Sequence, residues 1–376
     1  MSSSHGGFLT YAPLLDPNMG LTGLHFAVHA RNPMVGVAAI QGLARAWPSE
    51  SVAVMVDAED ASPGPAYASV QLPTNGVLNL GPDPSPHREW MTGANGHCPS
   101  IALAPEFQSV WPAAQIVVPA AKLGAHALTG KSWVTGADSM ASFQQAAKAG
   151  ASHISGWPFL AREKAPDAKG GVPPSAVNVI KLIDLVNRDA DVDEIGAILK
   201  RDVVLGYKLV ALVNSAAHGL PVEVHSYQHA ITMLGMARLK RWLSLLLVTA
   251  GGGSQPTVLL RTALIRAAFF EEIGRQLGYV EDADDLFLCG AFSLLDVILG
   301  MSFADILDEV TLPERMADAL LNEGEPFGPL LRLVRAIEGG DAAEVESVAG
   351  RLMLQPARCN AALLLALRAG LRVDLG

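Results

Sequence analysis

The stretch PPSAVNVIKLIDLVNRDADVDEIGAILKRDVVLGYKLVALVNSAAHGLPVEVHSYQHAITMLG, residues 173–235, decides the fold of the second half of the chain. Within it, Val177, Ile180 and Ile183 recur every three residues, which places them on one face of a helix. Further apolar runs with helical spacing continue to the end of the chain, so the sequence predicts an all-helical domain. The expected helices are 176–187, 193–202, 207–216, 226–234, 237–250, 257–278, 284–300, 303–310, 313–323, 328–340 and 360–372.

The first half follows a different pattern, rich in Pro and Gly and poor in charge. Short apolar pieces typical of strands stand at Ser51–Val56, Gly76–Leu80 and Ala114–Pro119, and a helical piece stands at Met34–Ala46. Continuous apolar strands of this kind fit a mostly parallel sheet that is buried on both faces. The first half is therefore predicted to be an α/β domain.

The boundary between the halves is expected within Ala161–Ser175, which is first charged, then rich in Gly and Pro, and poor in large apolar residues. The predicted organisation is an α/β domain over residues 1–163, a linker over 164–175 and a helical domain over 176–376.

Composition and charge narrow the classes of partner. Half of the 376 residues are apolar and 17% are charged, which is enough apolar material for packed cores. The net charge of −10 argues against nucleic-acid binding, which depends on clustered Lys and Arg. The compact basic candidate is Arg238–Trp242. The longest apolar runs fall well short of the roughly 20 residues that cross a bilayer, so no membrane contact is expected.

The three cysteines, Cys98, Cys289 and Cys359, lie far apart and form no CxxC pair. This spacing argues against a cysteine-based zinc site and against a disulfide framework. The odd number of cysteines and an N-terminus without the pattern of an export signal predict a cytoplasmic protein.

Three histidines, His218, His225 and His229, raise the question of a metal site. Ser226 stands where a helix N-cap is expected, so His225 lies outside the helix that carries His229 and the two do not share a face. A zinc hydrolase needs three ligands and a nearby carboxylate base, and Glu223 is the only one close by. The histidines are predicted to be structural or surface residues, with a metal site as the alternative.

Residues 173–235 resemble the start of an HDOD domain. The resemblance rests on the proline-led first helix, the DADVDEI segment, LVNSAAHGL, and VHSYQHAITMLG. The later stretch FLCGAFSLLDVILGMSFADILDEVTLPERMADALL (Phe287–Leu321) is similar to a subfamily that carries a degenerate EAL domain in front. The resemblance implies a helical bundle used for regulation and protein contact, related to HD-type metal phosphohydrolases.

The metal site of those phosphohydrolases uses an adjacent His-Asp pair, and nowhere in this chain does His stand directly before Asp. By the resemblance, Ser293–Leu294 takes the place of that pair. A hydroxyl and a leucine do not hold a divalent cation. Asp296 lies nearby, and a single carboxylate there is predicted to be a surface or capping group.

The first half resembles a degenerate EAL domain at its two ends, Phe8–Ala30 and GADSMASFQQAAKAGASHISGWPFL (Gly136–Leu160). Active EAL domains hydrolyse cyclic di-GMP with two metals held by acidic and Asn side chains at barrel strand ends. By the resemblance, the signature Glu falls on His25. The paired aspartates that the family carries after a later strand have no counterpart here, and Asp284–Asp285, in the helical half, is the adjacent Asp pair of the chain.

Two further observations bear on the barrel. Asp57, Glu59 and Asp60 cluster after a predicted strand, where they form either a strand-end site or, as favoured here, a solvated turn. A complete eight-stranded barrel needs at least about 200 residues. Roughly 160 residues supply at most about six strand–helix units, so the first half is expected to be a degenerate EAL-type TIM-like barrel that is truncated or has lost helices.

The remaining candidate residues are predicted to serve the fold and not a binding or catalytic site. Ser155 lacks the turn of a nucleophilic serine, and Trp157 and Phe159 are predicted to lie in the core or between domains. Asn214 and Ser215 are expected to bond their own backbone at a helix end, and Gly219 to allow a tight turn.

The predicted function is a non-catalytic bacterial signalling adaptor, with no catalytic, cofactor-binding or metal residue. Its partner is expected to be a regulatory protein, a kinase or a cyclic-nucleotide enzyme. The alternatives are a cyclic di-GMP receptor that does not hydrolyse the nucleotide and, third, a residual metal-dependent phosphohydrolase.

Overall fold

The structure is a computed structural model of the 376-residue chain. It describes residues 7–29, 38–39, 42, 53–58, 76–79, 100–103, 115–124, 128, 132–160, 174–213, 226–249, 257–309 and 312–372. The chain divides into two compact units. Unit 1 comprises residues 1–164, 256–261 and 332–376, and unit 2 comprises residues 165–255 and 262–331.

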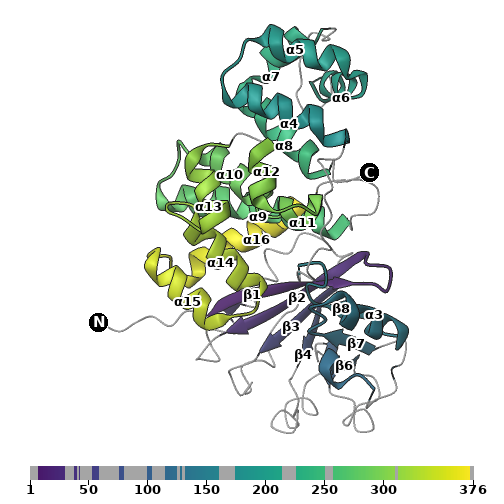
Figure 1. The fold of residues 1–376 in the computed structure, drawn as a ribbon. Coiled ribbons are helices and arrows are strands. Elements are labelled where there is room, and N and C mark those ends of the chain that lie inside the picture. The colour runs from purple at the N-terminus through teal and green to yellow at the C-terminus, as the bar shows by residue number, and fades with distance from the viewer. Residues whose placement is uncertain are drawn as a thin grey trace. The chain divides into compact units, whose positions relative to one another are not determined.

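Unit 1 contains a closed barrel of eight strands in chain order. The first strand runs antiparallel to both of its neighbours, and the other seven run parallel (Figure 1). The strands are β1 (Phe8–Leu15), β2 (Leu21–His29), β3 (Ala53–Ala58), β4 (Gly76–Asn79), β5 (Ser100–Leu103), β6 (Gln115–Pro119), β7 (Ser132–Thr135) and β8 (His153–Ser155). The predicted α/β character and the three predicted strands are confirmed.

The expected maximum of about six strand–helix units is wrong for the strands, because the barrel has all eight. The length argument assumed strands and helices of ordinary size, whereas four of these strands have only three or four residues. Between the strands, the described regular elements are α3 (Met140–Lys148), η4 (Ala120–Lys122) and helical residues at 38–39 and 42. Most of the predicted helix Met34–Ala46 lies outside the described residues.

The barrel interior is a packed apolar core. Leu14, Val77, Val117 and Trp133 come from four different strands and form one buried cluster, which is possible only inside the barrel. Because side chains alternate along a strand, the neighbouring Leu15 points outward.

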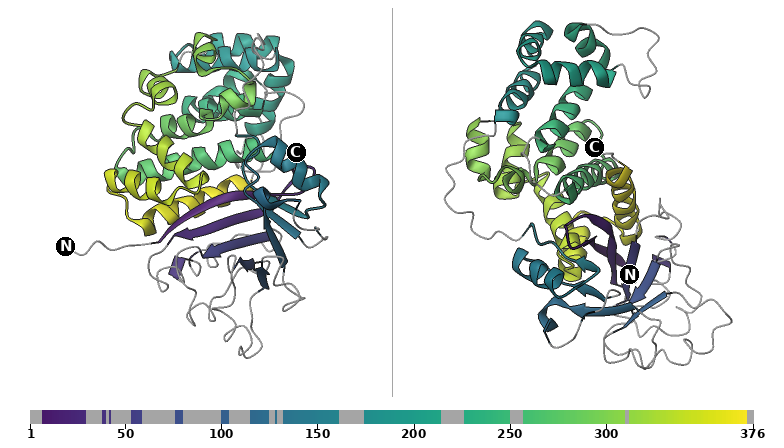
Figure 2. Two further views of the ribbon diagram at one scale, coloured as in Figure 1. Left: turned by 60° about the horizontal axis from the view of Figure 1, so that its bottom comes forward. Right: turned by 90° about the vertical axis from the view of Figure 1, so that its right-hand side faces the viewer.

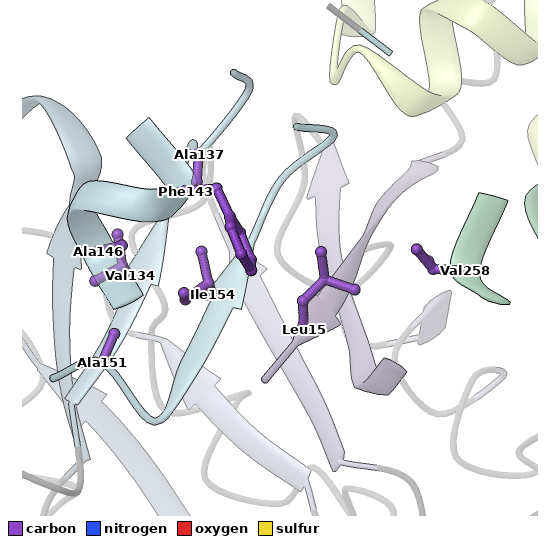
Figure 3. Close-up of a cluster of buried hydrophobic side chains, with 8 residues drawn as sticks. All are labelled: Leu15, Val134, Ala137, Phe143, Ala146, Ala151, Ile154 and Val258. Carbon is purple, nitrogen blue, oxygen red and sulfur yellow. The ribbon is translucent and has the colours of Figure 1, made fainter. Parts of the chain in front are cut away.

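Leu15 belongs to a second cluster, in which the outer wall of the barrel packs against α3 (Figure 3). Val134 and Ile154 of the wall contact Phe143 and Ala146 of the helix there. The two clusters together bury both faces of the strands, as the continuous apolar strand patterns predicted.

The C-terminal helices α15 (Ala342–Arg351) and α16 (Pro356–Arg372) belong to the same unit as the barrel and contact β1 (Figures 1 and 2). The amide of Asn360 joins them: its Oδ1 accepts a hydrogen bond from the Leu9 N–H at 2.9 Å, and its Nδ2 donates to the Gly7 carbonyl at 2.8 Å. The sequence placed residues 332–376 in the helical domain. The predicted domain boundaries at 163 and 176 remain a prediction. The division into compact units differs from them, because residues 332–376 belong to the unit of the barrel.

Unit 2 is helical, as predicted. Its helices are α4 (Pro174–Asn187), α5 (Val192–Arg201), α6 (Val203–Val213), α7 (Tyr227–Leu234), α8 (Met236–Thr249), most of α9 (Thr257–Leu277), α10 (Ala283–Phe292), α11 (Leu295–Leu299), α12 (Phe303–Glu309), α13 (Glu314–Asn322) and the start of α14 (Gly328–Glu338). The stretch predicted as one helix over 284–300 is two helices, because the chain breaks at Ser293 and Leu294.

Candidate functional site

The carboxyl ends of the parallel strands are the place where barrels of this kind position functional side chains. Polar residues end several of these strands: His29 on β2, Asn79 on β4 and Thr135 on β7. Asp57 of β3 is in register with Asn79, so the backbone brings these two strand ends side by side. Asn79 lies two residues beyond the interior residue Val77 and therefore faces the same side of the sheet.

Two hydrogen-bonded pairs join histidines to hydroxyl groups in the barrel. His29 Nε2 lies 2.8 Å from the Thr10 hydroxyl, and His25 Nδ1 lies 2.8 Å from the Ser155 hydroxyl. Thr10 and Ser155 are buried, and both histidines are half-buried. Since β1 runs antiparallel to β2, its early residue Thr10 reaches the carboxyl end of the barrel, where it fixes the His29 ring.

A third histidine, His153 of β8, stacks on the Trp133 ring with centroids 4.7 Å apart. Desolvation by burial lowers the pKa of His153 below its ordinary value, and the nearby Asp16 carboxylate opposes that shift more weakly. The barrel therefore favours the neutral imidazole at this position.

The lowered pKa of His153 predicts a pH dependence of stability. Below about pH 6.5 the unfolded chain takes up a proton at His153 before the folded chain does, so the free energy of unfolding falls as the pH decreases through that region. We expect the variant His153→Phe, which retains an aromatic ring beside Trp133, to lose this part of the dependence. Urea denaturation of both proteins from about pH 8 to about pH 5 measures it. Parallel pH profiles of the two proteins would contradict the prediction.

The candidate site residues of the first half lie in different surroundings. His25, which the resemblance aligned with a signature Glu, lies within β2 and its Nδ1 is 2.8 Å from the Ser155 hydroxyl. Of the acidic cluster, Asp57 lies on β3, whereas Glu59 and Asp60 lie outside the described residues.

The three histidines of the helical half are only partly described. His218, His225 and the turn residues Asn214, Ser215 and Gly219 lie outside the described residues, as does Glu223. His229 is exposed in the first turn of α7, and its backbone N–H donates to the Ser226 hydroxyl at 3.2 Å. The predicted N-cap is confirmed.

Ser293 and Leu294, which the resemblance aligned with the His-Asp pair of the phosphohydrolases, are buried, and a cationic side chain of the protein contacts Ser293. Ser293 and Leu294 are 2% and 3% exposed. The guanidinium of Arg266, also buried, donates to the Ser293 hydroxyl at 2.9 Å and to its carbonyl at 3.3 Å. The Ser293 hydroxyl donates in turn to the Gly290 carbonyl at 2.7 Å. Asp296 is half-buried in the first turn of α11.

The basic candidate Arg238–Trp242 is engaged by acidic side chains. Lys240 forms an ion pair with Asp285 at 2.9 Å, and Arg241 pairs with Glu271. The Arg241 guanidinium also lies 3.8 Å from the centre of the Phe287 ring. The ion pairs and the ring contact of this segment therefore link α8 to α9 and α10.

The described cysteines are buried. Burial raises the pKa of the Cys359 thiol to about 12, so it stays protonated near neutral pH. Cys98 lies outside the described residues. Trp157 is buried and packs edge-on against Tyr11 and Phe159, so it is a core residue of unit 1.

The described residues contain neither a metal-binding cluster nor a helix that could span a membrane. Nowhere among them do three His, Cys, Asp or Glu side chains gather as a metal ion would require. No described helix is both long and apolar enough to cross a membrane.

Sequence reasoning missed the two histidine–hydroxyl pairs. Ser155 and His25 are separated by 130 positions, and Ser155 was judged only for a nucleophile motif. The usable signal was the resemblance of both chain segments to the two ends of one domain, which implies that the first and last strands of a closed barrel are neighbours.

Comparison with known proteins relates the chain to one domain family. The HDOD domain family matches residues 172–312. Over 204 residues, which are 54% of this chain and 47% of the relative, the chain is 27% identical to the cyclic di-GMP phosphodiesterase CdgJ of Vibrio cholerae. Over 163 residues, 43% of this chain and 40% of the relative, it is 28% identical to the protein YuxH of Bacillus subtilis. The matches thus span less than half the length of these relatives, and no solved structure matches.

The prediction that the protein is not an enzyme is contradicted by its similarity to CdgJ, whose name states a phosphodiesterase activity. That prediction rested on metal ligands that were missing at the positions implied by the resemblance and on the short length of the first half. A barrel assembles its site from the ends of several strands, so side chains far apart in the chain meet there without forming a linear motif.

Proposed function

Because residues 172–312 form an HDOD domain, we propose that the protein works in cyclic di-GMP signalling and that its barrel binds the nucleotide. The similarity to CdgJ carries this proposal, since it covers more than half of the chain and links it to a protein named for cyclic di-GMP. The polar carboxyl end of the barrel, with His29, Asn79 and Thr135, is the surface to which we assign the nucleotide.

The barrel is, in this proposal, an EAL-type domain with altered site residues. Two observations support it. The stretches that resemble the ends of an EAL domain contain β1 and β8, which pair with each other and close the barrel. In addition, the side chain at the place of the signature Glu, His25, lies inside the ring of strands and bonds Ser155 of the last strand.

The chemistry of the proposed site suits a phosphate-bearing ligand. The imidazole of His29 and the amide of Asn79 can each donate a hydrogen bond to a phosphate or base oxygen. Thr10 holds the His29 ring in one orientation through the hydrogen bond between its hydroxyl and Nε2. A pre-positioned donor of this kind binds at lower entropic cost than a mobile side chain.

The test is a calorimetric titration of the purified protein with cyclic di-GMP in Mg²⁺ or Mn²⁺, followed by chromatography of the nucleotide. We expect affinity in the micromolar range or tighter, and about tenfold weaker binding for His29→Ala. His229→Ala is the matched control, because it removes the same ring from an exposed site in unit 2. Appearance of the linear dinucleotide would identify a phosphodiesterase, and binding without product would identify a receptor. No heat of binding would overturn the proposal.

The helical unit offers a second candidate function, the binding of a regulatory protein such as a kinase or a cyclic-nucleotide enzyme. Tyr207 on α6 is 72% exposed and Met233 on the neighbouring α7 is 40% exposed. Tyrosine and methionine are enriched at protein–protein interfaces, so this pair of helices is the surface to which we assign such a partner.

A further inference from the structure

A cavity of about 530 Å³ lies on the outer side of the barrel, between the start of β1 and α16. Its walls are mainly apolar and built from small residues. The described lining residues are Gly7, Leu9, Ala38, Ala39, Gly42, Pro356, Ala357, Asn360, Ala361, Leu364, Leu365 and Arg368. All of them belong to unit 1, so the cavity is a feature of that unit alone.

The cavity lies apart from the proposed nucleotide site. Leu9 alternates with the interior residue Thr10 on β1 and therefore faces the outside of the barrel. The described walls include no aromatic ring on which a base could stack.

The polar groups of the cavity have different roles. Both ends of the Asn360 amide are committed to the backbone of β1, where they hold α16 in place. Arg368, one of the described wall residues and the charged one among them, is half-buried, and no described carboxylate forms an ion pair with it. A cation in the wall of a mainly apolar cavity is complementary to a ligand with one negative group and an apolar body.

Ala361 and Leu365 continue this surface along α16. They precede Arg368 on one stripe of the helix, because they lie seven and three residues before it. Leu365 is 50% exposed, although large apolar side chains on a helix that packs against a barrel are usually buried. A bound apolar chain would cover Leu365 and leave the Arg368 guanidinium at its end.

We propose that this cavity binds a small amphipathic monocarboxylate, such as a medium-chain fatty acid, with its carboxylate on Arg368 and its chain along Ala361 and Leu365. The volume lies in the range of cavities that take small-molecule ligands, about 300–1,000 Å³. An Arg guanidinium forms two parallel hydrogen bonds with a carboxylate, which gives both orientation and affinity. The site is independent of the proposed cyclic di-GMP function.

The test uses decanoate as the probe, kept below its micelle-forming concentration and titrated into the full-length protein by calorimetry. We expect saturable binding, about tenfold weaker for Arg368→Gln because the charged hydrogen bonds are lost. Decanol, with the same chain and no charge, should bind the wild type and Arg368→Gln equally. Arg358→Gln is the matched control, since Arg358 is exposed on the same helix and does not line the cavity.

A second variant tests the cavity itself, independently of how much the Arg368 charge contributes to binding. Ala361→Trp places a large side chain into the cavity from an exposed helix position, so it should fold normally and abolish binding of both probes. Unchanged decanoate binding in Ala361→Trp would overturn the proposed site. Equal binding of decanoate by wild type and Arg368→Gln would overturn the role of the guanidinium, and absence of binding to the wild type would overturn the proposal entirely.

Discussion

Gly290→Ala is expected to lower the free energy of unfolding of the helical unit by roughly 3 kcal/mol, the upper end of the usual cost of overpacking. The backbones of α9 and α10 approach each other closely at Gly290. A Cβ atom at Gly290 would lie 2.6 Å from the Arg266 carbonyl oxygen and 2.7 Å from the Ala267 Cα. Both are backbone atoms, so the new methyl group can be accommodated only if one helix moves.

The matched control is Gly196→Ala, in the middle of α5 of the same unit. A Cβ there would meet only the Gln228 side chain, at 3.6 Å or more, which is ordinary contact. Replacing a helical glycine by alanine without a clash should stabilise the unit by about 0.5–1 kcal/mol. Urea denaturation followed by circular dichroism measures both variants. A Gly290→Ala protein as stable as Gly196→Ala would show that α9 and α10 are not in backbone contact.

Ser293→Ala is expected to destabilise the same unit by about 2 kcal/mol, within the range for a hydrogen bond to a charged group. The reason is the buried Arg266 guanidinium, which is 3% exposed and loses its 2.9 Å acceptor when the hydroxyl is removed. A buried cation that loses a partner retains its full desolvation cost.

The double variant Arg266→Met with Ser293→Ala separates this explanation from simple loss of packing. If the cost comes from an under-bonded cation, removing the cation as well should recover most of the lost stability. Additive losses in the two single variants and the double variant, measured by urea denaturation, would show that Arg266 and Ser293 do not interact.

The helical half could be predicted from the sequence because its information is local. An apolar face repeats within each helix, and Ser226 marks a helix start that the structure confirms. The missed helix α15 carries the same kind of signal, since its N-cap Asp341 accepts from the Glu344 N–H and Val345 and Val348 are buried. It was overlooked because its exposed positions are small and acidic, which weakens the apolar pattern.

The barrel was only partly predictable, since strand number depends on pairing between distant segments. A strand of three residues, such as His153–Ser155, carries too few side chains for a periodic signal. Its position in the sheet is fixed by pairing with β1 on one side and β7 on the other, for example with Leu14 and Trp133. These residues are distant from it in the sequence. For this reason the length argument gave too few strands.

The contacts of the candidate sites were the least predictable. His25 and Ser155 meet because the barrel closes, and Arg266 and Ser293 meet because two helices cross. Neither pair shares a motif. The resemblance singled out the positions of His25 and Ser293, and it could not show which side chains these residues contact.

The Asn360 side chain binds the backbone of the first strand across some 350 positions of sequence. A ribosome makes the barrel strands first and α16 last, with all of unit 2 in between. During translation, the Leu9 N–H and the Gly7 carbonyl therefore lack their hydrogen-bond partner, the Asn360 side chain, until the helical unit has been synthesised. In sequence, the HDOD-bearing unit therefore lies between the first and the last part of unit 1, and expression of residues 1–163 alone would leave the outer side of β1 without its helix.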